Sequence, residues 1–180
     1  MYRIATWYRR RARRLAEDRS GVVAMEFILV APVFFFLIFA ILETSFLFFT
    51  ATVMNGEVSS VARSIRTGNL QLEDDPEDKF YELLCENLDN VLDCDKVIVD
   101  IRTYADFDDM AFDEFLNDEG EAEGNLFDIG EAGEVVLVRI AYKYQIITPF
   151  LAEFLAPPNQ DTLMLQAAAA FQNEPFQSLF

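Results

Sequence analysis

The residues that could do chemistry in this 180-residue chain are carboxylates and two cysteines, because the sequence contains no histidine. Without histidine there is no imidazole general base, no Ser-His-Asp or Cys-His arrangement and no imidazole metal ligand. Two cysteines are also too few for a four-thiolate zinc site. We therefore expect no enzymatic activity, no catalytic residue, no metal site and no cofactor.

Acidic residues cluster in an insert at 104–134, which contains the stretch DFDDMAFDEFLNDEGEAEGN. Clustered carboxylates could bind calcium, but the regular D-x-D-x-D-G loop is absent and no glycine stands where its sharp turn would need one. We interpret the insert as a solvated acidic face with one short amphipathic helix through Phe107, Met110, Ala111 and Phe115. The alternative is a single-pass, anchored periplasmic protein that uses the insert as a calcium-dependent binding module or as an enzyme site.

Glu26 is the carboxylate in the most unusual position, because it lies just inside an apolar run, where a charge is costly and needs a partner. Cleavage after Gly21 would create a terminal ammonium at Val22, four residues before Glu26 and on the same helix face. The carboxylate would relieve the unfavourable interaction of that amine with the helix dipole, or neutralise the amine of a neighbouring subunit. A plain interfacial glutamate beside the cytoplasmic headgroups is the alternative.

The element that must position Glu26 is a membrane helix. Residues 27–42 are 16 consecutive residues without a charge, which cover about 24 Å of a hydrocarbon core about 30 Å thick. The span must therefore include neighbouring apolar residues. Glu43 interrupts the apolar run and is a candidate for a partner site in the membrane span. A buried core helix of a soluble protein is the competing interpretation.

Charge on either side of this helix predicts its orientation. The first 20 residues carry seven arginines against Glu17 and Asp18, a net charge of +5, whereas the remaining 160 residues carry −22. The positive-inside rule then keeps the N-terminus in the cytoplasm and exports the C-terminal part. An acidic body repels phosphates, so we expect no nucleic-acid partner. A cleaved secretory signal and a mitochondrial presequence are the competing interpretations of the first residues.

The exported part predicts an α+β fold. Val58, Val61, Ala62 and Ile65 have helical spacing, so the transmembrane helix is expected to continue as a stalk to Gly68. Alternation and helical spacing then predict a helix at 76–92 capped by Asp75 and Pro76, a short helix at 149–155, and strands at 97–101, 136–146 and 163–171. We expect a three-stranded antiparallel sheet in a chain divided into a basic leader (1–21), a transmembrane helix and stalk (22–68) and an exported domain (69–180).

The two cysteines, Cys85 and Cys94, fall in this exported part, nine residues apart. An even number of cysteines in an oxidising compartment predicts a disulfide. The loop-entropy relation gives roughly 2.5–3 kcal/mol for closing a loop of this length. Such a bond would connect the helix at 76–92 to the sheet.

The N-terminal motif resembles a known family. Basic residues followed by Gly21, with Glu26 and Phe27 at the fifth and sixth places after the glycine, resemble the cleavage motif of type IVb (Flp-like) prepilins. The longer strings RSGVVAMEFILVAPVF, FAILETSFLFF and VARSIRTG resemble the TadE/TadF-like pseudopilins of the tight-adherence pilus. The resemblance continues through both cysteines into DCDKVIVDIRTY and covers about 21–104 well.

The resemblance implies that a prepilin peptidase cuts between Gly21 and Val22, that Glu26 and Phe27 are recognition positions, and that Cys85 and Cys94 are the family's paired cysteines. It implies a minor pseudopilin of the bacterial inner membrane, with a periplasmic C-terminal domain or a place in the surface pilus. Its partners would be other pseudopilins and pilus assembly proteins. The chain departs from the family in its acidic insert and in Val22, where many pilins carry Phe. A signal-anchored structural protein without processing is the remaining alternative.

Overall fold

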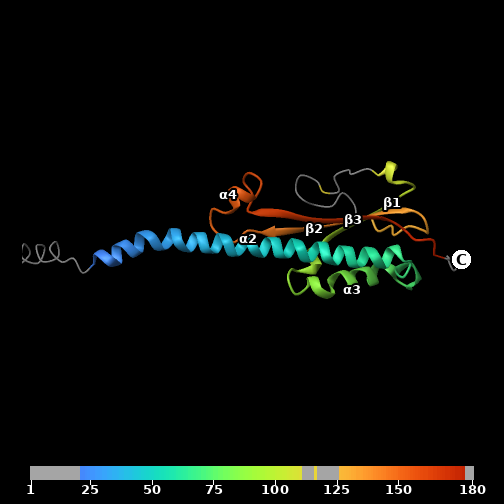
Figure 1. Ribbon diagram of the computed structural model, residues 1–180, viewed down its shortest axis with the longest axis horizontal. Helices are drawn as coiled ribbons and strands as arrows, with labels where there is room; N and C mark the ends of the chain where they lie inside the picture. The colour runs from blue at the N-terminus through green and yellow to red at the C-terminus, as the bar shows by residue number, and fades with distance from the viewer. Residues whose placement is uncertain (1–20, 111–115, 117–125, 177–180) are drawn as a thin grey trace, which may run out of the picture. The chain divides into compact units, whose positions relative to one another are not determined.

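A long apolar helix followed by an α+β domain with a three-stranded antiparallel sheet makes up the structure, as predicted (Figure 1). The computed structural model describes residues 21–110, 116 and 126–176. The chain divides into two units, with the boundary between Leu42 and Glu43. The helices are α2 (Val22–Arg66), α3 (Pro76–Leu88) and α4 (Ala152–Leu155), and the strands are β1 (Ile98–Tyr104), β2 (Val135–Gln145) and β3 (Thr162–Gln172).

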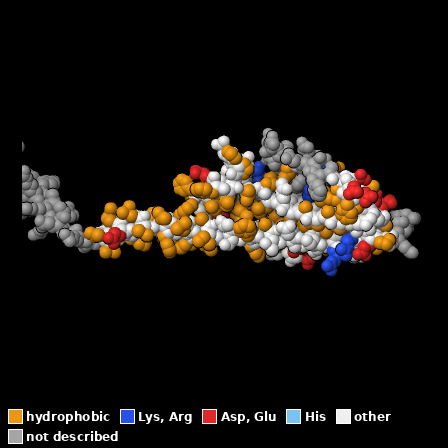
Figure 2. Space-filling model, turned by 45° about the horizontal axis from the view of Figure 1, so that its top comes forward, with side chains coloured by type: hydrophobic (Ala, Val, Ile, Leu, Met, Phe, Trp, Pro, Cys, Tyr) orange, Lys and Arg blue, Asp and Glu red, His pale blue; other side chains and the backbone are white. Residues whose placement is uncertain are grey.

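The first half of α2, residues 22–42, exposes its apolar side chains. Within the described residues, α2 contains the one helical segment long and apolar enough to cross a membrane, and none of that segment is buried in the protein. Figure 2 shows hydrophobic side chains covering this part of the helix. From Val22 to Leu42 the helix rises about 31 Å, close to the thickness of a hydrocarbon core.

The second half of α2 belongs to the domain. Its buried side chains recur every three or four residues, which places them on one face of the helix. They include the four residues predicted to form the apolar face of a stalk, and they are Glu43, Leu47, Thr50, Met54, Val58, Val61, Ala62 and Ile65. The buried stripe begins at Glu43, about four turns before Val58, where the sequence pattern places the start of the stalk's apolar face.

The helix α2 ends where the sequence predicts. Gly68 has a φ of 78°, in the left-handed region that glycine adopts readily, and its N–H donates to the carbonyl of Ile65 at 3.0 Å. A Cβ at this position would also lie 2.6 Å from the ring of Phe176. Glycine is thus required both for the turn and for the close approach of the C-terminal segment.

The helix α3 begins at Pro76, where the side chain of Asp75 accepts a hydrogen bond from the N–H of Asp78 at 3.1 Å. This confirms the predicted cap. The helix ends at Leu88, four residues earlier than expected. The chain turns back there, which brings Cys94 to a Cα–Cα distance of 5.9 Å from Cys85.

The sheet has the order β1-β2-β3, and both pairs are antiparallel. Each strand starts and ends within a few residues of the prediction. The central strand β2 is buried on both faces from Val135 to Ala141, whereas the sequence analysis expected alternation along it. The two neighbouring strands pair with the edges of β2, and its apolar residues at nearly every position from Val135 to Ala141 suit burial on both faces.

The acidic insert is described in part. Phe107–Asp109 forms a single short turn of helix, and Phe127 forms a parallel bridge with Ile101 of β1. The ring of Phe127 lies 5.5 Å from that of Phe80 in an edge-to-face contact, so the end of the insert packs on α3. Most of the helix predicted through Phe107 and Phe115 lies outside the described residues.

Candidate functional site

The first candidate site is the peptide bond between Gly21 and Val22, which lies at the start of α2. Gly21 is exposed and its carbonyl accepts the N–H of Met25 at 3.0 Å, which closes the first turn of the helix. A Cβ at Gly21 would meet no atom within 4 Å. Because neither space nor a positive φ demands glycine here, the fold itself places no requirement on this position.

Glu26 and Phe27 follow on α2, one turn after Val22. Both side chains are exposed, and Phe27 keeps 65% of its surface accessible. Helix geometry places Val22 and Glu26 on the same side, as the sequence spacing predicts. The structure thus places Val22 and Glu26 one turn apart on an exposed surface of α2.

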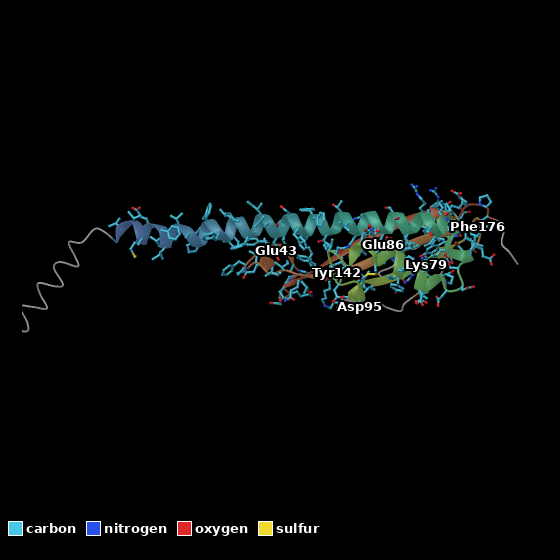
Figure 3. The ribbon with its side chains drawn as sticks, turned by 90° about the horizontal axis from the view of Figure 1, so that it is seen from below. Glu43, Lys79, Glu86, Asp95, Tyr142 and Phe176 are labelled. Atoms are coloured by element: carbon cyan, nitrogen blue, oxygen red, sulfur yellow. A yellow bond between two sulfur atoms is a disulfide. The ribbon has the colours of Figure 1, made fainter. Side chains whose placement is uncertain are left out.

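Glu43 lies in different surroundings, at the first position of the domain unit. Glu43, labelled on α2 in Figure 3, is 9% exposed. Its side chain accepts hydrogen bonds from two backbone N–H groups, those of Ile147 and of Thr148, the latter at 2.7 Å. These amides follow the end of β2. The sequence identified Glu43 as a candidate partner site in the span, and the structure pairs its carboxylate with the chain's own backbone. No local pattern indicates such a partner about a hundred residues away.

The cysteines form the predicted disulfide between Cys85 of α3 and Cys94, which precedes β1. The carboxylate of Asp89 accepts the backbone N–H of Cys94 at 3.3 Å, which supports the turn between them. The bond connects the helix to the first strand, as the sequence indicated.

A buried ion cluster was missed by the sequence reasoning. Asp100 of β1 is fully buried and lies opposite Arg139 of β2 in the register. Arg139 donates from Nε at 2.9 Å, and Arg102 donates to the other carboxylate oxygen at 3.0 Å. Removing one partner of such a buried pair typically costs 3–5 kcal/mol. The pairing depends on the register of β1 and β2. That register cannot be predicted from two opposite charges 39 residues apart in the sequence.

Metal ligation has no support in the part of the chain that the structure describes. No group of three or more His, Cys, Asp or Glu side chains there could hold an ion. Many carboxylates of the insert, at 111–115 and 117–125, lie outside the described residues. The candidate sites are therefore the N-terminal motif, the Glu43 contact and the disulfide.

These features define a class of protein, in which an N-terminal helix apolar enough to cross a membrane precedes a small disulfide-bonded α+β domain. Residues 21–63 match a family model described as "TadE-like protein", which confirms the predicted resemblance for this stretch. The match begins at Gly21 and covers Glu26, Phe27 and Glu43. No curated protein and no solved structure matches the chain.

Proposed function

We propose that this protein is a TadE-like minor pseudopilin that supports the assembly or anchoring of a tight-adherence pilus and has no enzymatic activity. The observation that carries the proposal is the family match over residues 21–63, which starts at the glycine of the cleavage motif. The fold supports it, because α2 presents an apolar surface that the protein itself does not cover. Other pseudopilins and pilus assembly proteins are the proposed partners.

Prepilin peptidase is the proposed processing enzyme, and it cuts between Gly21 and Val22. The bond lies at an exposed turn, and the helix begins directly after it. Cleavage would therefore leave α2 intact, with Val22 as its first residue, and would remove the leader and its net charge of +5. Since the fold does not require glycine at 21, a requirement for glycine would come from the protease cleft, where the absence of a Cβ lets the backbone lie close.

Glu26 has a defined role in this proposal. A carboxylate one turn from a new terminal amine forms a charge-assisted contact of about 1.5–3 kcal/mol, within the chain or with a neighbouring subunit. Phe27 would be recognised together with Glu26. The exposure of both side chains is consistent with recognition by another protein.

The proposed location is the bacterial inner membrane, with the N-terminus in the cytoplasm and the domain in the periplasm. The arginine-rich leader and the disulfide both support this orientation. A reporter that is active only in the periplasm should be active when fused after Phe180 and inactive when fused before Met1. The reverse result would overturn the orientation.

Piliation tests the function. In a strain that lacks the gene, wild-type protein should restore tight-adherence pili, whereas Glu26→Gln should insert normally and restore them poorly, because it keeps the shape and loses the charge. The matched control is Glu86→Gln, which changes an exposed carboxylate on α3. Counting pili by electron microscopy distinguishes the variants, and normal piliation with Glu26→Gln would leave Glu26 as an ordinary interfacial residue.

A further inference from the structure

The connection between β2 and β3 exposes large apolar side chains. We call residues 147–155 the apolar loop. Within the domain unit, its Ile147, Phe154 and Phe150 are the three most exposed large hydrophobic residues described, at 84%, 77% and 68%. Figure 2 shows hydrophobic side chains gathered at the end of the domain that carries α4. A group of exposed apolar side chains this close together marks a surface that contacts a membrane or another protein.

The apolar loop is held in a defined conformation. Ile146 donates its N–H to the carbonyl of Asp161 at 2.9 Å, which closes the base of the connection. Leu151 and Thr148 are buried, and the N–H of Leu151 donates to the carbonyl of Thr148 at 3.2 Å. Phe150 between them has a φ of 64°, unusual for a bulky residue. The fold thus fixes Leu151 in the core and leaves Phe150 outside.

The hydrogen bonds of Glu43 indicate that the apolar environment nearest to the loop is the membrane. Its carboxylate accepts hydrogen bonds from the amides of Ile147 and Thr148, so the start of the loop is held at Glu43, the residue that directly follows Leu42. Leu42 ends the apolar stretch that begins at Val22 and contains one charged residue, Glu26. This stretch rises about 31 Å, close to the thickness of a hydrocarbon core. With residues 22–42 in the bilayer, a loop hydrogen-bonded to Glu43 starts next to the residue where the chain leaves the hydrocarbon core. Apolar side chains can enter the interfacial region there by about 5–10 Å.

The low charge of the apolar loop favours contact with lipid through insertion of its apolar side chains. Between residues 146 and 158 the only charged side chain is Glu153, in a chain whose residues 21–180 carry a net charge of −22. The acidic domain as a whole is not attracted to an anionic membrane surface. A nearly uncharged segment is the part that can enter the headgroup region with the least electrostatic cost.

We propose that Ile147, Phe150 and Phe154 insert into the periplasmic leaflet of the membrane that α2 spans, which gives the domain a second membrane contact beside its helix. This inference rests on the proposed membrane insertion of α2. The inserted side chains would determine which face of the domain meets the bilayer. Glu43 would connect the loop to α2 through its hydrogen bonds to Ile147 and Thr148.

Tryptophan quenching by brominated lipids tests the contact in the full-length protein. The chain has one tryptophan, Trp7, which is replaced by Phe in every variant. Each variant is reconstituted in vesicles of ordinary or bromine-labelled phosphatidylcholine. Phe154→Trp should lose most of its emission in brominated vesicles. The matched control is Phe107→Trp, an exposed aromatic position outside the apolar loop, which should lose little.

A third variant separates this inference from the proposal on which it rests. Phe34→Trp reports on the apolar half of α2 and should be strongly quenched if α2 is in the bilayer. Quenching of Phe34→Trp without quenching of Phe154→Trp would overturn the loop contact alone. An unquenched but blue-shifted Phe154→Trp would indicate a protein neighbour and would equally overturn it. Absence of quenching at Phe34→Trp would instead contradict the membrane insertion of α2.

Discussion

The two halves of α2 belong to one continuous helix and have opposite surroundings. Apart from Glu26, residues 22–42 are apolar on all sides, and none of their most hydrophobic segment is buried in the protein. From Glu43 to Arg66 a mostly apolar stripe is buried. The other positions carry exposed Phe46, Phe48 and Phe49 near the start, and after Val53 they are polar, charged or glycine. A helix that is apolar all round needs an apolar environment on every side, whereas an amphipathic helix needs it on one face only. The change of pattern at Glu43 therefore marks where the environment that the helix needs changes from apolar on every side to apolar on one face.

The glutamates of the two halves show the same contrast. Glu26 is exposed on the apolar half, whereas Glu43 is buried and binds two backbone amides of its own chain. A carboxylate satisfied within the fold contributes to the stability of that fold. A carboxylate left exposed on an apolar helix remains open to a partner outside it. The two acids are chemically alike and differ in their surroundings.

The largest expected effect concerns the glycines of the two halves. Gly21→Leu should block removal of the leader completely, because a branched side chain cannot lie in a cleft that accepts glycine. Gly56→Leu is the matched control, since Gly56 also has open space around its Cβ position and lies on the domain half of α2. The intact mass of membrane-extracted protein checks both. Equal processing of the two variants would show that Gly21 is not read as a cleavage position.

A second prediction compares buried and exposed residues of α2. Met54→Ala should lower the free energy of unfolding of the domain by about 2–5 kcal/mol, because the side chain is fully buried. Phe34→Ala should change it by less than about 0.5 kcal/mol, since Phe34 lies in the exposed half. Hydrogen exchange of the β2 amides in detergent measures both. A large effect of Phe34→Ala would break the distinction between the two halves.

The disulfide should stabilise the domain and leave the apolar half of α2 unaffected. Replacing Cys85 and Cys94 by Ser should lower the domain's free energy of unfolding by roughly 2.5–3 kcal/mol, the loop-entropy value. Reductant should lower the wild-type value by the same amount and leave the double variant unchanged. Alkylation of native protein without reductant should label neither cysteine. Full labelling would contradict the bond and weaken the exported assignment.

The smallest effect is expected for Glu43→Gln. Glutamine keeps the shape and one acceptor but loses the charge, which should cost about 1–2 kcal/mol across the two hydrogen bonds. Faster hydrogen exchange of the Ile147 and Thr148 amides measures the loss. Glu26→Gln is the matched control and should leave these amides unchanged. Equal exchange in both variants would mean that Glu43 does not hold the loop.

Local patterns predicted most of the fold. The cap at Asp75, the glycine turn at Gly68 and the disulfide follow from residue types within about ten positions of one another, and the structure confirms them. The pairs of Asp100 with Arg139 and of Glu43 with the amides after β2 could not be predicted. Both depend on strand register and on how α2 packs, which are properties of the folded chain rather than of any short segment.

The N-terminal motif is a different case. The sequence predicted the positions of Gly21, Val22 and Glu26, and the family match covers them. The roles proposed for them involve a protease and neighbouring subunits, which are outside the structure of this chain. What the structure adds is that the fold does not itself need glycine at position 21.

The most direct test of the central claim is the intact mass of the wild-type protein extracted from membranes of cells with active prepilin peptidase. We predict a chain that has lost residues 1–21 and begins at Val22, together with the full-length chain in cells whose peptidase is inactive. Full-length protein in the presence of the active peptidase would contradict the claim that this is a processed pseudopilin.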